Sequence, residues 1–474
     1  MSISNNKLFG TNGVRGIFGE SLSIPFLIDL SYSIGTFFNH GPLVLGFDGR
    51  SSSFAISKIV SSVLMSMGID VYNMGLTPTP CLQFTVKDSN FSGGIMITAS
   101  HNPSEFNGLK PVSDNGMELS RSEEILIEDA YFNKKYLEIP DNGFGDLFCL
   151  GDALKKYIVK VFSLIDVESI KQHKFKIVMD MGNGMQSLVA PIMAKELNCE
   201  VLIINGDIDG EFSARGSEPK MENLSNLINF VKKSNADFGV AFDGDGDRSI
   251  FCDENGIIHW GDKTGPLLAY YLIKVKKLLT SVVCPINSSV VISKICKEID
   301  AKVIFTKVGS IEVTQTMNHT GSKIGFEENG GFFYGLLNNV RDGAVTTALI
   351  LEMLSYYKLH PLNVNSISKN RKDNDRITLS KLYEFIDTTF QHKSSIKLSN
   401  LNDYSNILNL CRNHGSIKKI EEIDGIKIWF DDDSWIMFRP SGTEPLLRIY
   451  AESDDKYLLD SKVREYTELI RKSL

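Results

Sequence analysis

The sequence lacks the features that mark secreted, membrane-spanning and disulfide-bonded proteins. No apolar run reaches the length of a membrane span, and the opening MSISNNKLFG contains no apolar core of signal-peptide length. The seven cysteines are odd in number and scattered, and none forms a CxxC pair, which argues against a disulfide framework and a structural zinc site. We therefore expect a cytoplasmic protein with reduced cysteines.

Clusters of basic residues are also missing. The formal net charge is -8, which argues against a nucleic-acid-binding surface. The charged and hydrophobic fractions, 23% and 42%, are ordinary for a globular protein. The 474 residues exceed a single core and suggest roughly three or four domains. We expect small-molecule partners, no nucleic acid and no membrane, and a monomer or homodimer.

The segment Ser92–Pro103, SGGIMITASHNP, combines an apolar run with a polar loop. Ile95–Ile97 is apolar on both faces and flanked by turn formers, which predicts a short buried strand. Pro103 moves Asn102 out of the helical region, so a loop follows the strand. Ser100 is then held at a strand's carboxyl end, where open α/β sheets bind ligands. The alternative is a polar turn that only caps the next element.

An internal repeat organises most of the chain. The repeated segments are PLVLGFDGRSSS (42–53), FKIVMDMGNGMQS (175–187) and SVVCPINSSVVIS (281–293). Each is a β-branched apolar strand followed by a small or polar turn and a segment with helical spacing. Roughly 40–60 residues after each opening strand comes a second strand with a polar tip. We interpret these segments as three copies of one α/β unit, whose loops lie at the same end of each sheet and converge on one cleft.

The second tip, FGVAFDGDGDR (238–248), carries the strongest chemical signal. An apolar strand ends in Asp243, Asp245 and Asp247, separated by single glycines. Carboxylates this close repel one another, and a bound divalent cation resolves that conflict. All-oxygen donors suit Mg²⁺. An EF-hand fails on Arg248, where that loop needs glycine, and on the strand that precedes it; a solvated acidic turn is the other alternative.

The third tip, GFEENGG (325–331), offers Glu327, Glu328 and Asn329, a set suited to sugar hydroxyls, although a plain glycine-rich turn would look the same. Just before it, Lys307 follows the predicted strand Lys302–Phe305. This lysine either reaches an anionic substrate or is solvated.

Two further loops carry arginine. FGTNGVRG (9–16) is rich in glycine, so its backbone N–H groups can line an anion while Arg15 supplies a bidentate clamp; an ordinary turn is the alternative. WIMFRPSGTEPLLRIY (435–450) places Arg439 and Arg448 around two hydroxyls and a glycine between strand-like runs. That combination matches the geometry of phosphate, and a decorated hairpin turn is the alternative.

The last part of the chain shows a change in composition. A helical pattern over Ala344–Tyr357 precedes the polar stretch Lys369–Asn374, which we interpret as a linker. We predict four domains at residues 1–150, 151–256, 257–368 and 369–474.

These motifs together resemble the α-D-phosphohexomutase family, which includes phosphoglucomutases, phosphomannomutases and phosphoglucosamine mutases. The matching segments are TASHNP, DGDGDR and RPSGTEP, supported by FGTNGVRG and GFEENGG. The resemblance implies an α/β fold with four domains around a central cleft. The first three would be similar α/β units with mixed sheets, and the fourth a smaller α+β domain.

The resemblance also implies a phosphoryl-transfer site. Ser100 would be the phosphoserine, and Mg²⁺ would be held by the three aspartates and one oxygen of phospho-Ser100, with Arg248 beside them. Arg15, His101 and Lys110 match positions near the reacting phosphate, and Lys110 is a candidate for proton handling. The activity implied is interconversion of hexose 6-phosphate and hexose 1-phosphate, with a hexose 1,6-bisphosphate as intermediate and priming agent.

The family pattern assigns the remaining residues to the substrate. Glu327 and Asn329 would bind the sugar hydroxyls. The non-reacting phosphate would be held in the last domain by Arg439, Ser441, Gly442, Thr443 and Arg448.

The sequence departs from the family at two positions. Many relatives have histidine where this chain has Gly331, and some have histidine in the segment that here contains Ser310. The general acid and base are therefore left open. FGTNGVRG favours a phosphoglucosamine mutase and UDP-GlcNAc supply, whereas GFEENGG resembles archaeal-type phosphomannomutase/phosphoglucomutase enzymes. A sugar-phosphate phosphatase and a non-catalytic sugar-phosphate binder are the rival hypotheses.

Overall fold

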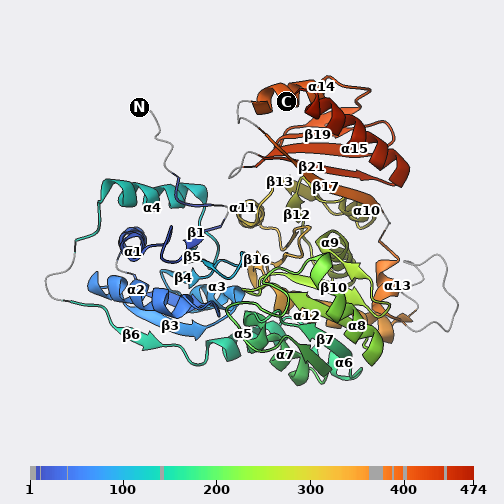
Figure 1. The fold of residues 1–474 in the computed structure, drawn as a ribbon. Helices are drawn as coiled ribbons and strands as arrows, with labels where there is room; N and C mark the ends of the chain where they lie inside the picture. Colours follow the sequence, from blue (N-terminus) through green and yellow to red (C-terminus); the bar gives the residue numbers. More distant parts are fainter. Residues whose placement is uncertain are drawn as a thin grey trace.

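The computed structural model describes residues 7–10, 12–39, 41–138, 143–361, 377–386, 389–398, 403–441 and 446–473. Four sheets follow one another along the chain, and we call the units that carry them domains I to IV (Figure 1). This arrangement confirms the predicted fold class. The residue boundaries given above stay a prediction, and the proposed linker lies outside the described residues.

Domain I contains a six-stranded sheet in the order β1-β5-β4-β2-β3-β6. Its elements are β1 (Val14–Ile17), α1 (Ile24–Phe38), β2 (Leu43–Phe47), α2 (Ser53–Ser66), β3 (Val71–Leu76), α3 (Thr79–Asp88), β4 (Gly93–Ile97), β5 (Phe106–Ser113), α4 (Arg121–Asn133) and β6 (Leu147–Cys149). The strand predicted at Ile95–Ile97 is confirmed as the end of β4, which is buried throughout.

Domain II contains a five-stranded sheet in the order β11-β10-β9-β7-β8. Its elements are α5 (Ala153–Phe162), α6 (Val167–Lys171), β7 (Lys176–Asp180), η1 (Met185–Leu188), α7 (Ala190–Glu196), β8 (Glu200–Ile204), η2 (Met221–Asn223), α8 (Ser225–Ser234), β9 (Phe238–Phe242), β10 (Ser249–Asp253) and β11 (Ile258–His259).

Domain III contains a five-stranded sheet in the order β13-β12-β14-β15-β16. Its elements are α9 (Gly261–Tyr270), η3 (Tyr271–Val275), β12 (Val282–Pro285), α10 (Val291–Glu298), β13 (Val303–Thr306), α11 (Ser310–Thr320), β14 (Ile324–Phe326), β15 (Phe332–Tyr334), β16 (Asn338–Arg341) and α12 (Gly343–Leu359). The helix predicted at Ala344–Tyr357 is confirmed as α12, which begins one residue earlier and ends two residues later.

The first three sheets share one pairing pattern. The strand that opens each repeat (β2, β7 or β12) pairs in parallel with a neighbour on either side. The second of those neighbours (β4, β9 or β14) then pairs antiparallel with the next strand along the chain. This common order confirms the predicted repeat. It also places the loops after β4, β9 and β14 at equivalent positions in the three domains.

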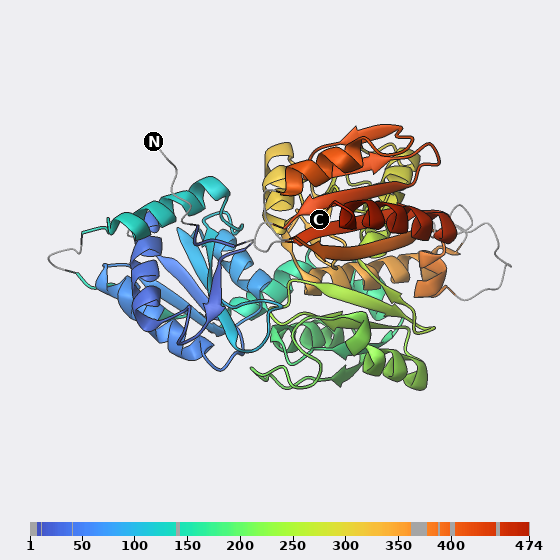
Figure 2. The same ribbon diagram turned by 45° about the horizontal axis from the view of Figure 1, so that its top comes forward.

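Domain IV is an antiparallel sheet with helices packed on it. Its elements are β17 (Phe390–Lys397), α14 (Asp403–Arg412), β18 (Lys419–Glu421), β19 (Ile426–Trp429), β20 (Trp435–Pro440), β21 (Leu446–Ser453) and α15 (Lys456–Arg471), and the strand order is β17-β21-β20-β19-β18. The short helix α13 (Leu379–Tyr383), which precedes them, packs against α9 and belongs to the core of domains II and III. Domain IV lies above domain III and beside the gap to domain I (Figures 1 and 2).

The hydrophobic cores show which domains are joined. Domains II and III share one large hydrophobic core, which also includes Cys81 and Phe84 from α3 of domain I. Domain IV has a core of its own. It meets domain III through a smaller apolar cluster that contains Ile286, Trp435 and Tyr450. Within the described part of the chain, none of the helices has the length and apolar character needed to cross a membrane.

The junction between domains II and III also contains a buried hydrogen-bonded pair. Tyr157 of α5 donates to the carboxylate of Asp342, with its hydroxyl 2.7 Å from both oxygens. The same carboxylate caps α12 by accepting from the backbone N–H groups of Ala344 and Val345. Burial raises the pKa of Asp342 to about 7.

We predict that Tyr157→Phe destabilises this junction. A hydrogen bond to a charged group contributes about 1.5–3 kcal/mol, so the Tm measured by calorimetry falls. The matched control is Tyr457→Phe, because Tyr457 is 86% exposed. The Tm of this variant should equal that of the wild type. Equal Tm values for Tyr157→Phe and the wild type would contradict the prediction.

Candidate active site

The loop after β4 holds Ser100 in an uncommon backbone conformation. Ser100 has a φ of 50°, in the left-handed region, and is buried. A non-glycine residue there costs about 1–3 kcal/mol, and such strain persists only where the surroundings enforce it. The backbone N–H of Ser100 donates to Thr98 Oγ1 at 2.8 Å, and Thr98 donates to Asp48 at 2.6 Å. The structure therefore presents Ser100 as a fixed nucleophile candidate.

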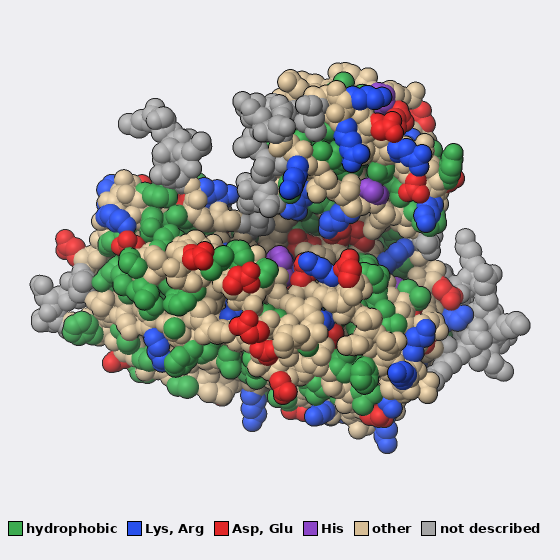
Figure 3. Space-filling view, viewed as in Figure 1, with side chains coloured by type: hydrophobic (Ala, Val, Ile, Leu, Met, Phe, Trp, Pro, Cys, Tyr) green, Lys and Arg blue, Asp and Glu red, His purple; other side chains and the backbone are tan. Residues whose placement is uncertain are grey.

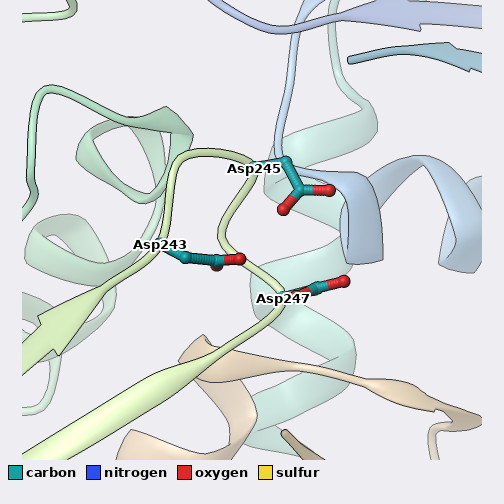
Figure 4. A group of neighbouring side chains, drawn as sticks. All are labelled: Asp243, Asp245 and Asp247. Carbon is teal, nitrogen blue, oxygen red and sulfur yellow. The ribbon is translucent and has the colours of Figure 1, made fainter. Parts of the chain in front are cut away.

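The loop between β9 and β10 gathers the three aspartates. One carboxylate oxygen from each of Asp243, Asp245 and Asp247 lies within 4.8 Å of the others, and all three residues are buried (Figure 4). Oxygen atoms of Asp245 and Asp247 are buried without a hydrogen-bond partner. The three carboxylates therefore converge on one place, as the sequence predicts.

The electrostatics of this cluster suit a divalent cation. Burial, together with the charge of Asp247, raises the pKa of Asp243 to about 8. Burial also disfavours the charged form of Asp245, but Lys110 and the hydrogen bond from Thr79 outweigh it and lower the pKa of that carboxyl. Three buried carboxylates, two of them with an unpartnered oxygen, are a donor set that Mg²⁺ prefers, so the residues present fit this ion.

The serine loop and the aspartate loop meet. Ser100 Oγ lies 3.4 Å from Asp243 Oδ2 and 3.3 Å from Nδ1 of His101. Thr79, the first residue of α3, donates to Asp245 Oδ2 at 2.7 Å and ties the aspartate loop to domain I. Loops from domains I and II thus place a hydroxyl beside the carboxylate cluster.

An ionic network connects the aspartates to domain III. Lys110 Nζ of β5 lies 3.0 Å from Glu118 and 3.7 Å from Asp247. Arg341, the last residue of β16, pairs with Asp247 and, at 3.1 Å, with Glu327. Burial opposes ionisation of Glu118, but Lys110 and Arg341 lower its pKa to about 2. Sequence reasoning missed Glu118 and Arg341. Arg341 could have been found from the sequence as a charged residue at the tip of a strand, whereas no sequence pattern marks Glu118.

Arg15 contacts the serine loop, and His101 is part of it; their predicted place near the reacting phosphate stays a prediction. Arg15 on β1 donates through Nη1 to Ala99 O at 3.1 Å and to Asn102 Oδ1 at 2.6 Å. The imidazole of His101 lies partly open to solvent at the cleft. Burial on its inner side and the positive charges of Arg248 and Arg15 lower the pKa of His101 to about 2.

Arg248 lies between the aspartates and a cavity. Its Nε donates to Asp243 Oδ2 at 3.0 Å, and its Nη1 lies 3.4 Å from Glu218. The cavity has a volume of about 510 Å³ and is lined by residues of domains II, III and IV, including Arg248, Asn329 and Lys393. Glu327 lies deeper, buried against Arg341.

Two of the proposed phosphate residues, Arg439 and Arg448, lie on one face of the domain IV sheet. Arg439 on β20 stands directly opposite Arg448 on β21, so the two side chains project to the same side. Like charges in that position repel, which favours an anion between them. Arg439 Nε donates to Asp424 at 2.6 Å, and the backbone N–H of Ser441 donates to the hydroxyl of Tyr404 at 3.2 Å. Gly442 and Thr443 lie outside the described residues.

Comparison with known proteins places this geometry in a family. Models described as phosphoglucomutase/phosphomannomutase match the chain at residues 6–138 (alpha/beta/alpha domain I), 155–256 (domain II), 260–370 (domain III) and 401–468 (C-terminal domain). The phosphoglucosamine/phosphogalactosamine mutase of Sulfurisphaera tokodaii is 37% identical and covers 98% of this chain and 99% of its own. The chain belongs to the α-D-phosphohexomutase family.

Two further relatives agree with this placement. The phosphoglucomutase/phosphomannomutase of Thermococcus kodakarensis is also 37% identical to this phosphohexomutase chain and covers 98% of it and 97% of its own. The crystal structure of a phosphoglucomutase/phosphomannomutase family protein from Burkholderia thailandensis superposes with a TM-score of 0.83 at 21% identity, over 98% of this chain and 97% of that one. This structural likeness shows the fold.

The phosphohexomutase cleft is visible on the molecular surface. Figure 3 shows a hollow beneath domain IV, with Asp and Glu side chains inside it and Lys and Arg side chains on the wall above. Lys307, which follows β13, is exposed, and nothing in the structure tests its predicted contact with substrate. The roles of the other described site residues stay predictions.

We predict that Gly244→Ala separates the two catalytic loops of this phosphohexomutase. A Cβ at Gly244 would lie 2.9 Å from Ser100 O and 3.1 Å from the ring of Phe212. Because a shift of about 1 Å in reacting groups costs up to about a hundredfold in rate, we expect mutase kcat to fall at least about tenfold.

The matched control is Gly151→Ala, where an added Cβ meets nothing within 4 Å. This variant should keep the wild-type kcat. An unchanged kcat in Gly244→Ala would show that the loops do not need this close contact.

Proposed function

We propose that this protein is a Mg²⁺-dependent hexose-phosphate mutase. It interconverts hexose 6-phosphate and hexose 1-phosphate through phospho-Ser100 and a hexose 1,6-bisphosphate that also primes the enzyme. The observation that carries the proposal is the strained, buried Ser100 whose Oγ lies 3.4 Å from the aspartate cluster. A serine held in this way beside a cation site is suited to storing a phosphoryl group between turnovers.

Asp243, Asp245 and Asp247 would hold Mg²⁺, together with one oxygen of phospho-Ser100. When bound, the ion supplies charge neutralisation and alignment of the phosphoryl group. The protein surrounds the same place with cations. Arg248 pairs with Asp243, and Arg15 of β1 donates to the backbone of the serine loop. Both are therefore placed to attract the oxygens of the transferring group.

The transfer step moves one phosphoryl group. A hydroxyl oxygen of the sugar attacks phosphorus while the bond from phosphorus to Ser100 Oγ breaks, and the hydroxyl proton passes to a base. Lys110 is our candidate for handling that proton: in its neutral amine form it would accept the proton, and Glu118 and Asp247 lie beside the nitrogen that would then carry the charge. The second half of the cycle reverses these bonds at the other end of the sugar and regenerates phospho-Ser100.

The phosphate that does not react is proposed to bind domain IV. Arg439 and Arg448 stand opposite each other on β20 and β21, and Ser441, Gly442 and Thr443 fall between them in the sequence. The bisphosphate must turn end for end in the cleft, and the separate core of domain IV is compatible with opening and closing as a unit. Lys307 is retained as a further candidate for contact with the substrate.

The sugar is proposed to bind Glu327 and Asn329, whose oxygen and nitrogen atoms suit hydroxyl groups. The relatives' names cover glucosamine, galactosamine, glucose and mannose phosphates. A glucosamine-specific mutase is therefore the alternative reading. A comparison of kcat/KM across the 1-phosphates of glucose, mannose and glucosamine decides between them, because specificity is a difference in transition-state binding.

The rival activities make different products. A phosphatase would transfer the phosphoryl group of Ser100 to water and release inorganic phosphate, and a non-catalytic binder would never carry phosphate on Ser100. We propose the cytoplasm as the compartment, in keeping with seven free cysteines, and sugar phosphates as the partners, without nucleic acid. The active form is proposed to be a monomer or homodimer.

We predict that Ser100→Ala loses nearly all mutase flux and still binds substrate. The substitution removes the oxygen that carries the phosphoryl group but leaves the arginines and the sugar loop intact. Mutase flux is measured as conversion of glucose 1-phosphate to glucose 6-phosphate, and binding by calorimetry. Near-normal turnover would exclude the mechanism, and release of inorganic phosphate by the wild type would favour the phosphatase.

We predict that Asp245→Asn weakens Mg²⁺ binding by about a hundredfold or more, because a unit charge about 4 Å away contributes ~4 kcal/mol at an effective dielectric of about 20. Titration calorimetry with MgCl₂ measures the Kd directly. Asp433→Asn is the control, since the side chain of Asp433 is 82% exposed and forms an ion pair with Lys418 at the surface. Equal Mg²⁺ affinity in Asp245→Asn and wild type would remove this residue from the metal site.

A further inference from the structure

We infer that Arg50 is a positioning residue for phosphoryl transfer: it holds the backbone of the Ser100 loop in its strained conformation and seats the aspartate loop of domain II against it. The inference rests on the proposed function, since it concerns the serine that stores the phosphoryl group. Arg50 lies in the turn between β2 and α2, and its side chain is 0% exposed.

The guanidinium of Arg50 is surrounded by acceptors from the serine loop. Its Nη2 donates to the carbonyl oxygens of Ser100 and Asn102, each at 2.8 Å. Its Nη1 donates to the carbonyl oxygens of Pro103 and Phe106, the latter at 2.9 Å. A guanidinium has five N–H donors, and here four of them bind carbonyl groups within seven consecutive residues. The loop is thus folded around this one side chain.

The fifth donor fixes the guanidinium itself. Arg50 Nε donates to Asp48 Oδ2 at 3.0 Å. The same carboxylate oxygen accepts from Thr98 Oγ1 at 2.6 Å, and Thr98 Oγ1 accepts from the backbone N–H of Ser100 at 2.8 Å. Both the N–H and the C=O of Ser100 are therefore connected to the Asp48–Arg50 pair. This arrangement accounts for the left-handed φ of 50° at Ser100.

Arg50 also contacts domain II. The ring of Phe212 lies against the guanidinium of Arg50, whose Cζ is 4.9 Å from the ring centroid. That ring is next to Gly244 of the aspartate loop, which in turn lies next to Ser100 O. Ser217 donates to Asn102 O at 2.9 Å, so domain II grips a carbonyl that Arg50 also holds. The separation of Ser100 from the aspartates is consequently set through Arg50.

Lysine cannot replace this geometry. Its ammonium is a point charge with three donors, whereas the contacts of Arg50 require a planar fork and a flat face for the ring of Phe212. The charge is conserved in Arg50→Lys, so this variant separates positioning from charge.

The test uses the full-length chain with MgCl₂ and compares wild type, Arg50→Lys, Phe212→Leu and Arg121→Lys. Arg121 is a half-exposed arginine on α4 of domain I that pairs with Glu124 and Glu128, and serves as the matched control. Three quantities are measured: the rate at which glucose 1,6-bisphosphate phosphorylates Ser100, by intact mass; kcat and KM for glucose 1-phosphate; and Tm.

We expect Arg50→Lys to lower kcat and the phosphorylation rate by about a hundredfold, with KM little changed. Phe212→Leu should lower both rates about fivefold, which corresponds to loss of a cation–π contact of about 1 kcal/mol. Arg121→Lys should match the wild type. A purely structural role predicts a lower Tm with an unchanged kcat per folded molecule.

Wild-type kcat in folded Arg50→Lys would overturn the inference. If Arg50→Lys does not fold, wild-type rates in Phe212→Leu would overturn it. A wild type that never accepts phosphate on Ser100 from the bisphosphate would instead refute the proposed function, so the two failures are distinguishable.

Discussion

Repulsion between buried carboxylates is the constraint on which the rest of this structure depends. Asp243, Asp245 and Asp247 lie within 4.8 Å of one another with almost no exposure to water. Burying charge in this way is costly unless opposite charge is close. Two further buried carboxylates, Glu118 and Glu327, join the network. The cations in contact with or acting on this group are Arg15, Lys110, Arg248 and Arg341.

Burial and the charge of Asp247 raise the pKa of Asp243 to about 8, so this carboxyl is mostly protonated at neutral pH. The four other carboxylates then face four cations, and their charges nearly balance. A phosphoserine adds about -1.5 to -2 at neutral pH, and Mg²⁺ adds two positive charges. The charges of phosphoserine and Mg²⁺ therefore nearly cancel when both are present, whereas either one alone would change the net charge of a buried site. If Ser100 carries a phosphoryl group as proposed, this charge balance would link the affinity for Mg²⁺ to the phosphorylation state of the enzyme.

The sequence was most informative where the chemistry lies in consecutive residues. Ser100 and the three aspartates each occur in one short segment, so strand ends and charge spacing were enough to predict them, and the pairing of the first three sheets confirmed the repeat. Glu118 and Arg341 were not predicted because they are connected across domains: Arg341 lies 3.7 Å from Glu118 and also pairs with Asp247. Arg50 was visible only as part of a repeated turn. Its role depends on loop carbonyls, and backbone carbonyls carry no sequence signal.

Asp424 connects domain IV to domain III close to the proposed phosphate site. Asp424 accepts from Arg439 at 2.6 Å and from the backbone N–H of Val308, at 3.0 Å, in the loop that follows β13. The carboxylate thus joins a proposed phosphate ligand of domain IV to a loop of domain III. A phosphate bound between Arg439 and Arg448 would compete with Asp424 for the guanidinium of Arg439. Because Arg439 and Asp424 both belong to domain IV, such a phosphate would loosen the Arg439–Asp424 pair and leave the contact of Asp424 with Val308 of domain III in place.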